Sequence, residues 1–111
     1  MDNIRRIKKN MKKIINEETW FHYLCKFECG VLEEHLIGPL YQYIINTGDV
    51  WNLQGFHMST AEDLIEEGIL ILGEKPIKNA YGFYYPSRYE VGNNSGSLEY
   101  QKKQGYKYID V

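Results

Sequence analysis

The spacing of glycines is the feature of this sequence that most restricts its fold. Gly30, Gly48, Gly55 and Gly68 separate segments whose apolar residues recur at helical spacing. Glycine often follows the last turn of a helix, because it adopts left-handed backbone angles without strain. We therefore predict a mainly α fold, a compact bundle of short helices in which each of these glycines ends a helix.

The apolar pattern places the longer helices in the first half of the chain. Residues 2–16 predict an amphipathic helix with a basic face, and residues 19–29 predict a second helix. Residues 31–48 predict a third, in which Pro39 removes a backbone donor and is expected to kink or restart the helix.

Two shorter helices are expected in the stretch that follows. Asp49 is a suitable cap for a helix of barely two turns over residues 50–54, with Trp51 as its core anchor. Ser59 and Glu62 have the spacing of a capping box and predict the start of the last helix. Residues 69–72 then form an apolar, strand-like segment.

Length and composition indicate one small soluble domain. The chain has 111 residues, of which 43% are hydrophobic and 25% charged, which is ordinary for a globular protein. No apolar run approaches the roughly 20 residues that cross a bilayer, and no signal peptide is recognisable. We expect a cytoplasmic protein, without membrane contact.

Charge divides the chain into three parts. Residues 1–16 hold six bases and one acid, for a charge of +5, whereas residues 17–74 hold eleven acids and one lysine, for −10. Residues 75–111 hold six bases and three acids, for +3. We therefore divide the chain into a helical domain over 1–74, with a basic helix (2–16) and an acidic module (17–74), and an aromatic arm over 75–111.

The arm is the candidate binding region. Seven of the ten tyrosines lie between Tyr81 and Tyr108, and tyrosine supplies large contact area at low cost in side-chain entropy. A competing interpretation is that the tyrosines form a small β-hairpin that covers the helices and completes their core. The residues predicted to bind a partner are Tyr81, Tyr84, Tyr85, Arg88 and Tyr89.

The basic N-terminal helix supports an alternative, nucleic-acid binding. Its cationic face would contact phosphates while aromatic residues of the arm stack on bases. The −10 charge of the acidic module argues against it. The residues that would bind nucleic acid are Arg5, Arg6, Lys8, Lys9, Lys12 and Lys13.

Metal and catalytic chemistry are weakly supported. The spacing of His22, Cys25, Cys29 and His35 is compatible with zinc, but small buried thiols that pack within a helix explain the cysteines better. The acidic pairs fit a solvated helix surface, and His57 is expected in a turn. We expect no metal, no cofactor and no enzymatic activity.

One run of residues resembles a known family. The motif combines a TG step, WxLQG and AxxLIExG within residues 26–72, and resembles a small bacteriophage domain of unknown function. This chain has FHM where a run like Tyr-Gly-Arg usually follows LQG, so no role of that arginine is carried over. The matching residues are Tyr41, Ile44, Ile45, Thr47, Gly48, Trp51, Leu53, Gln54, Gly55, Ala61, Leu64, Ile65, Glu66, Gly68 and Ile69.

The resemblance implies a phage or prophage origin and a compact helical module, and it implies no activity. Together with the aromatic arm, it leads us to expect an accessory protein that binds a host or phage protein, as inhibitors of host defence or transcription do. The alternatives are a nucleic-acid-binding protein and a virion or assembly protein. Self-association into a homo-oligomer is a further alternative.

Overall fold

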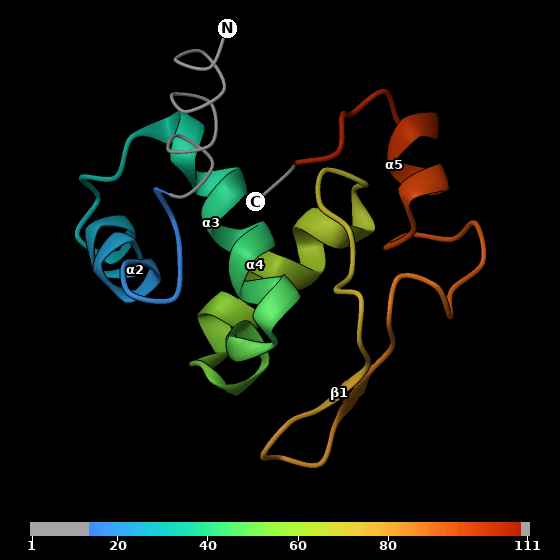
Figure 1. Cartoon of the computed structure of the whole chain (residues 1–111), viewed down its shortest axis with the longest axis horizontal. Coiled ribbons are helices and arrows are strands. Elements are labelled where there is room, and N and C mark those ends of the chain that lie inside the picture. The colour runs from blue at the N-terminus through green and yellow to red at the C-terminus, as the bar shows by residue number, and fades with distance from the viewer. Residues whose placement is uncertain (1–13, 110–111) are drawn as a thin grey trace, which may run out of the picture.

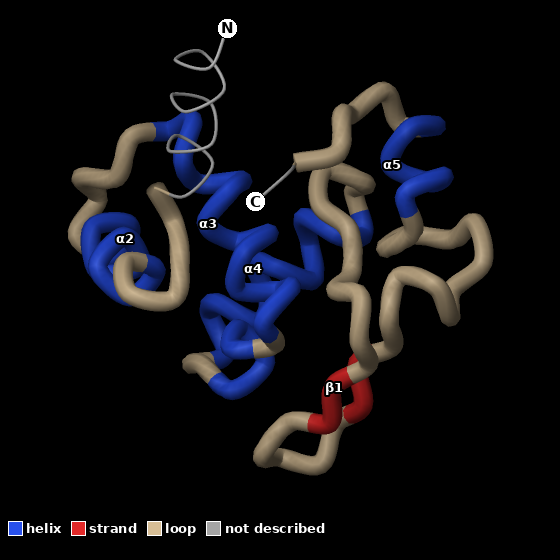
Figure 2. Tube along the Cα trace, in the orientation of Figure 1, coloured by secondary structure: helices blue, strands red, loops and turns tan. Residues whose placement is uncertain are grey.

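The computed structural model describes residues 14–109 and shows a mainly α protein with one small hairpin (Figure 1). Helices fill one half of the molecule, and loops make up most of the C-terminal half (Figure 2). This confirms the expected fold class. In chain order the elements are α2 (Trp20–Glu28), α3 (Glu34–Thr47), the 3-10 helix η1 (Asp49–Asn52), α4 (Gly55–Glu66), β1 (Ile77–Lys78), β2 (Tyr84–Tyr85) and α5 (Leu98–Lys103).

The core lies between α2, α3, η1 and α4. Trp51 is 2% exposed, which confirms that it is a core residue, but η1 is a single 3-10 turn and not the two-turn helix expected. The segment after α4 also contributes to this core. The buried apolar residues of the core are Ile15, Leu24, Leu40, Tyr41, Ile44, Ile45, Val50, Trp51, Ala61, Ile65, Leu70 and Leu72.

Helix α3 is continuous through Pro39, so the restart expected near Gly38 is absent. The helix ends at Gly48, whose φ of +85° is the left-handed conformation expected there. A Cβ at Gly48 would lie 2.6 Å from Cδ1 of Ile77. Glycine is therefore required twice here, by its backbone angle and by the packing of β1 on the end of α3.

Helix α4 begins one turn earlier than its capping signal predicted. Gln54 is the N-cap and Gly55 the first helical residue, so Ser59 lies inside the helix and Gly55 does not close η1. The added turn contains His57, which is 2% exposed and bonds to residues of α2 and α3. These tertiary contacts outweigh the local capping preference, and the prediction of His57 as a turn residue is wrong.

The apolar segment after α4 is not a strand. A buried glutamine of α3, Gln42, takes the place of a neighbouring strand: its Nε2 donates to the carbonyl of Ile71, 2.9 Å away, and its Oε1 accepts from the Ile71 N–H at 3.0 Å. Further along, the Leu72 N–H donates to the carbonyl of Gly96. The segment is thus fixed between α3 and the C-terminal arm.

The arm folds back against the helices. Strands β1 and β2 pair antiparallel, with Ile77 opposite Tyr85 and Lys78 opposite Tyr84, which confirms the expected small hairpin. After the hairpin, the Arg88 N–H donates to the carbonyl of Gly73, and the two segments run side by side (Figure 1). Ser97 then caps α5 through its side chain.

The expected basic helix over 2–16 lies almost wholly outside the described residues, and residues 14–16 form a bend. Ile15 is buried in the core. Within residues 14–109, none of the helices has the length and apolar character needed to cross a membrane.

Candidate protein-binding surface

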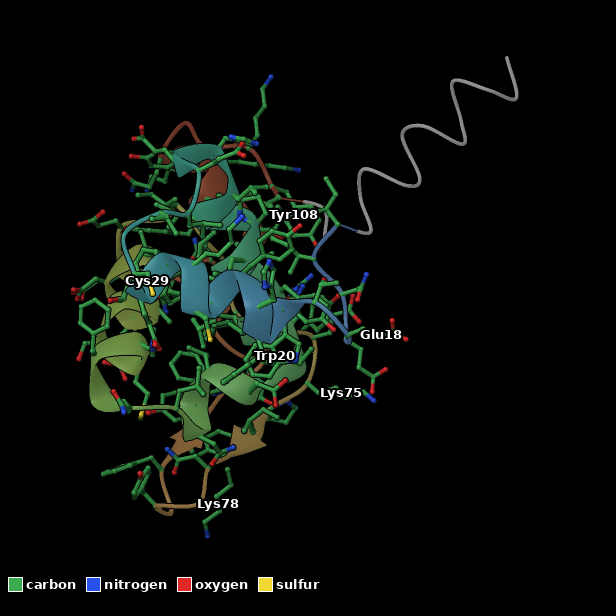
Figure 3. All side chains as sticks on the ribbon, turned by 90° about the vertical axis from the view of Figure 1, so that its left-hand side faces the viewer. Glu18, Trp20, Cys29, Lys75, Lys78 and Tyr108 are labelled. Carbon is green, nitrogen blue, oxygen red and sulfur yellow. The ribbon has the colours of Figure 1, made fainter. Side chains whose placement is uncertain are left out.

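Four aromatic side chains of the arm are solvent-exposed and close in sequence. We call Tyr81, Phe83, Tyr84 and Tyr89, which are 68%, 62%, 59% and 73% exposed, the hairpin surface. Three of them belong to the hairpin, which projects from the helices in Figure 1. Figure 3 shows Lys78 of β1 toward the end of the molecule opposite to Tyr108.

Asn79 fixes the hairpin loop. Its side-chain oxygen accepts hydrogen bonds from the N–H groups of Tyr81 and Phe83, at 3.0 and 2.9 Å. Its Nδ2 donates to the carbonyl of Trp51 in η1, 2.9 Å away. Asn79 is buried and these bonds are internal. The loop is thereby held in one conformation while its aromatic rings face solvent.

Tyr85 attaches the hairpin to η1. Its ring stacks on the ring of Trp51, with 4.0 Å between centroids and 9° between planes. Burial and the carboxylate of Glu62 raise the pKa of Tyr85. Tyr85 therefore belongs to the hairpin's attachment to the core, although it was proposed as a binding residue together with its neighbours.

Arg88 is also engaged within the molecule. Its side chain is 9% exposed. Its Nε donates to the carbonyl of Leu72 at 2.8 Å, and its Nη2 donates to Oδ1 of Asn46 at 3.0 Å. The sequence-based prediction placed Arg88 among the partner-binding residues, but these bonds assign it to the packing of the arm on α3. We therefore omit it from the binding set.

Tyr84 is exposed, and one hydrogen bond fixes the orientation of its side chain. Its hydroxyl donates to Oε2 of Glu90, 2.5 Å away, and this hydrogen bond to the carboxylate raises the pKa of Tyr84. Glu90 is next to Tyr89. The bond therefore links Tyr84 of β2 to the residue that follows Tyr89, the last member of the hairpin surface.

A polar chain crosses the helical core. The hydroxyl of Tyr41 lies 2.9 Å from Nδ1 of His57, and Nε2 of His57 lies 2.8 Å from Oε1 of Glu28. Burial raises the pKa of Tyr41 to about 12, so the phenol stays protonated at neutral pH and can donate to Nδ1. In the tautomer that carries its proton on Nε2, the imidazole accepts from Tyr41 and donates to Glu28. Tyr41 and His57 are buried, whereas the side chain of Glu28 is 51% exposed and connects the chain to the surface of α2.

Cys25 of α2 and Cys29, the C-cap of this helix, are both exposed, and Figure 3 labels Cys29. The prediction that they are buried packing thiols is therefore wrong. The core-facing side of this helix is occupied by Leu24. His22 and His35 are exposed too. Within residues 14–109, no three His, Cys, Asp or Glu side chains are arranged to hold a metal ion.

A second exposed apolar region lies on the helices. Phe21 and Phe56 are 60% and 63% exposed, and Phe56 stacks on Phe27 with 6.4 Å between centroids. Sequence reasoning overlooked Phe56 and Asn79. The signal for Asn79 was present, because an asparagine three residues before Gly82 is typical of a tight turn.

The six basic residues of the nucleic-acid alternative, Arg5, Arg6, Lys8, Lys9, Lys12 and Lys13, lie outside the described residues. The exposed cations of the arm include Lys102 and Lys103 on α5. Arg88, the arginine of the arm, makes the internal bonds described above.

Fold and surface together define a small, mainly α module with an aromatic hairpin that Asn79 and Tyr85 attach to its core. The family model described as "Domain of unknown function (DUF7417)" matches residues 10–81. Because the match covers well over half of the chain, the protein belongs to this family, which confirms the expectation of a domain of unknown function. Comparisons with curated proteins and with solved structures gave no match.

Proposed function

We propose that this chain is a non-enzymatic accessory protein that binds another protein through the hairpin surface. The observation that carries the proposal is the conformation of the hairpin loop. Asn79 fixes a loop whose aromatic rings face solvent, and Tyr85 attaches it to Trp51. Single exposed aromatic residues are common, but a group of them on a fixed loop is typical of binding sites.

A fixed loop also lowers the free-energy cost of binding. A partner that contacts Tyr81 or Phe83 does not have to order the loop, and tyrosine and phenylalanine have few side-chain torsions to restrict. Aromatic anchors at the centre of an interface each contribute roughly 2 kcal/mol or more. Two or three such anchors contribute about 4–6 kcal/mol, which is half or more of the roughly 8 kcal/mol of a micromolar complex, and the rest of the contact has to supply the remainder.

For the partner we propose a host or phage protein. The resemblance of the TG, WxLQG and AxxLIExG motif to a bacteriophage domain supports an accessory factor of phage or prophage origin, which acts in the bacterial cytoplasm. We propose that this accessory factor inhibits host defence or transcription.

Nucleic-acid binding is the second candidate, favoured by the +5 charge of residues 1–16. Two observations weigh against it. Residues 17–74 carry −10, which repels phosphates, and Arg88 is bonded internally. A virion or assembly role would use the same hairpin surface against a structural protein, and is therefore a version of protein binding.

The test compares variants in affinity capture from the host, followed by binding to the purified partner. Tyr81→Ala and Phe83→Ala remove two anchors of the hairpin surface. Phe21→Ala and Phe56→Ala are matched controls, because these phenylalanines are equally exposed but lie on the helices. We expect the hairpin variants to weaken binding at least tenfold and to keep the melting temperature of the parent.

Capture that survives the hairpin changes but is lost with Phe21→Ala or Phe56→Ala would contradict the proposal and move the site to the helices. Loss of capture after nuclease treatment, or in 0.5 M salt, would favour the nucleic-acid candidate, because phosphate contacts are strongly salt-dependent.

A further inference from the structure

A cavity of about 330 Å³ lies beside the hairpin surface, between the arm and the segment after α4. Tyr89 belongs to both the hairpin surface and the cavity wall. The bond from Tyr84 to Glu90 makes the two regions continuous along the chain. The residues that line the cavity are Ile71, Glu74, Arg88, Tyr89, Leu98, Glu99 and Tyr108.

The lining combines aromatic rings with carboxylates. Tyr89 and Tyr108 contribute two rings, and Glu74 and Glu99 contribute two negative charges. Glu99 makes no ion pair with any residue among 14–109. A cation is attracted both to the face of an aromatic ring and to a carboxylate. The cavity therefore has the chemistry that binds guanidinium or ammonium groups.

Arg88 is the one cation among the lining residues. Its hydrogen bonds are made within the protein, so it does not bind a ligand. Two of its nitrogens donate to Leu72 and Asn46. The third, Nη1, lies 3.9 Å from Glu74 and 3.5 Å from the hydroxyl of Tyr108. The centre of the guanidinium lies 5.6 Å from the ring centroid of Tyr108. Arg88 therefore positions Tyr108 and Glu74, and the lining keeps one net negative charge.

We propose that this cavity takes an arginine or lysine side chain of the protein that docks on the hairpin surface. The inference rests on the proposed function for its statement that the cation comes from a protein partner. Charge supports it, since the lining itself carries one net negative charge, from Glu74 and Glu99 against Arg88. The volume of the cavity accommodates a long side chain, with Leu98 and Ile71 against its methylene groups.

The test uses short peptides and the full chain. The peptide acetyl-Gly-Arg-Gly-amide is titrated into labelled protein and followed by NMR, with the same peptide carrying citrulline as the neutral control. We expect the arginine peptide to shift the amide signals of Tyr89, Leu98 and Tyr108, and the citrulline peptide to bind at least fivefold more weakly. The dissociation constant is expected in the millimolar range, since one side chain supplies all contacts.

Substitutions locate the site. Glu99→Gln should weaken binding of the arginine peptide on the order of fivefold, because a charge is lost. Tyr89→Ala should weaken it as well, because an aromatic face for the cation is lost. Glu18→Gln is the matched control, because it removes one exposed carboxylate outside the cavity lining (Figure 3). Equal binding of arginine and citrulline peptides, or equal loss with Glu99→Gln and Glu18→Gln, would overturn the inference.

The peptide titration and the capture experiment can refute the cation site and the proposed function separately. If the arginine peptide binds as expected but Tyr81→Ala and Phe83→Ala leave partner capture intact, the proposed function is overturned and the cation site remains. If the hairpin variants lose the partner but Glu99→Gln binds it with unchanged affinity, the hairpin surface stands, and a partner cation in the cavity is excluded.

Discussion

His57 joins three helices through two hydrogen bonds, to Tyr41 of α3 and to Glu28 of α2. Tyr41→Phe removes the hydroxyl and leaves Nδ1 of His57 buried without its partner. We expect a loss of about 1–3 kcal/mol in the free energy of unfolding, measured by urea denaturation at pH 7. Tyr106→Phe, at an exposed tyrosine, is the control and should change stability by less than about 0.5 kcal/mol. Equal stability of both variants would contradict a structural role for the chain.

The raised pKa of Tyr41 predicts an alkaline limit to stability. Its pKa is about 12 in the folded protein and 10.0 as the ordinary value, so the folded state retains a proton that the unfolded state releases. This contribution is fully present below pH 10 and is lost as the pH rises through 12, for a total of about 2–3 kcal/mol. Urea denaturation between pH 9 and pH 12 measures it. In Tyr41→Phe the decline should be smaller by that amount, and an identical decline in both proteins would refute the assignment.

Trp51 is the residue on which the helices and the hairpin meet. Its ring is buried in the core and carries Tyr85 on one face. Trp51→Ala should lower the free energy of unfolding by about 3–5 kcal/mol, enough to unfold much of a domain that is stable by about 5–15 kcal/mol. Circular dichroism and thermal melting measure the effect. A variant that melts at the parent temperature but fails to bind would assign Trp51 to ligand stacking instead.

The β1–β2 hairpin depends on Asn79 more than on strand pairing, since each strand has only two residues. Asn79→Ala removes the bonds to Tyr81, Phe83 and Trp51. We expect partner affinity to fall at least tenfold, because the aromatic rings lose their fixed positions. The helical circular dichroism should stay unchanged, and hydrogen exchange should accelerate at residues 80–84. Retained affinity with an unprotected loop would show that rigidity of the hairpin is unimportant for binding.

Local sequence signals located those elements whose stability is local. Helices α2 and α3, the Gly48 cap and the hairpin follow from apolar spacing and turn residues, and Trp51 was recognisable as a core residue. The start of α4 was missed because it depends on His57, whose partners are 16 and 29 residues away in the chain. The internal bonds of Arg88 were not foreseen for the same reason, since its Asn46 partner is 42 residues away.

The candidate site was predictable in its composition and not in its geometry. The density of tyrosines indicated the arm, but identical side chains have different roles within it. Tyr84 is exposed, whereas its neighbour Tyr85 stacks on Trp51. In a two-residue strand, alternation places one ring on each face, and only the packed structure shows which face meets η1. Cys25 and Cys29 are a similar case, because the apolar spacing of the helix did not show that they face solvent.

The arm and the helices share one core across the boundary drawn at residue 74. Ile77 packs on Gly48, and the carbonyl of Gly96 accepts from Leu72. From α5, Gln101 donates to the carbonyl of Ile69 at 2.8 Å. Each of these contacts joins the arm to a residue that is buried or partly buried in the helical part. The division into a helical domain over 1–74 and an arm over 75–111 therefore describes composition better than folding.

This sharing predicts that residues 1–74 do not fold on their own. Without the arm, Trp51 loses the ring stacked on it and the segment after α4 loses its bonds to Gly96 and Arg88. A domain of this size has only about 5–15 kcal/mol of stability, so we expect the 1–74 fragment to melt without a cooperative transition. Adding a peptide of residues 75–111 should restore the near-ultraviolet circular dichroism of Trp51. A 1–74 fragment that unfolds cooperatively, within about 1 kcal/mol of the full chain, would instead make the arm an independent appendage available entirely for binding.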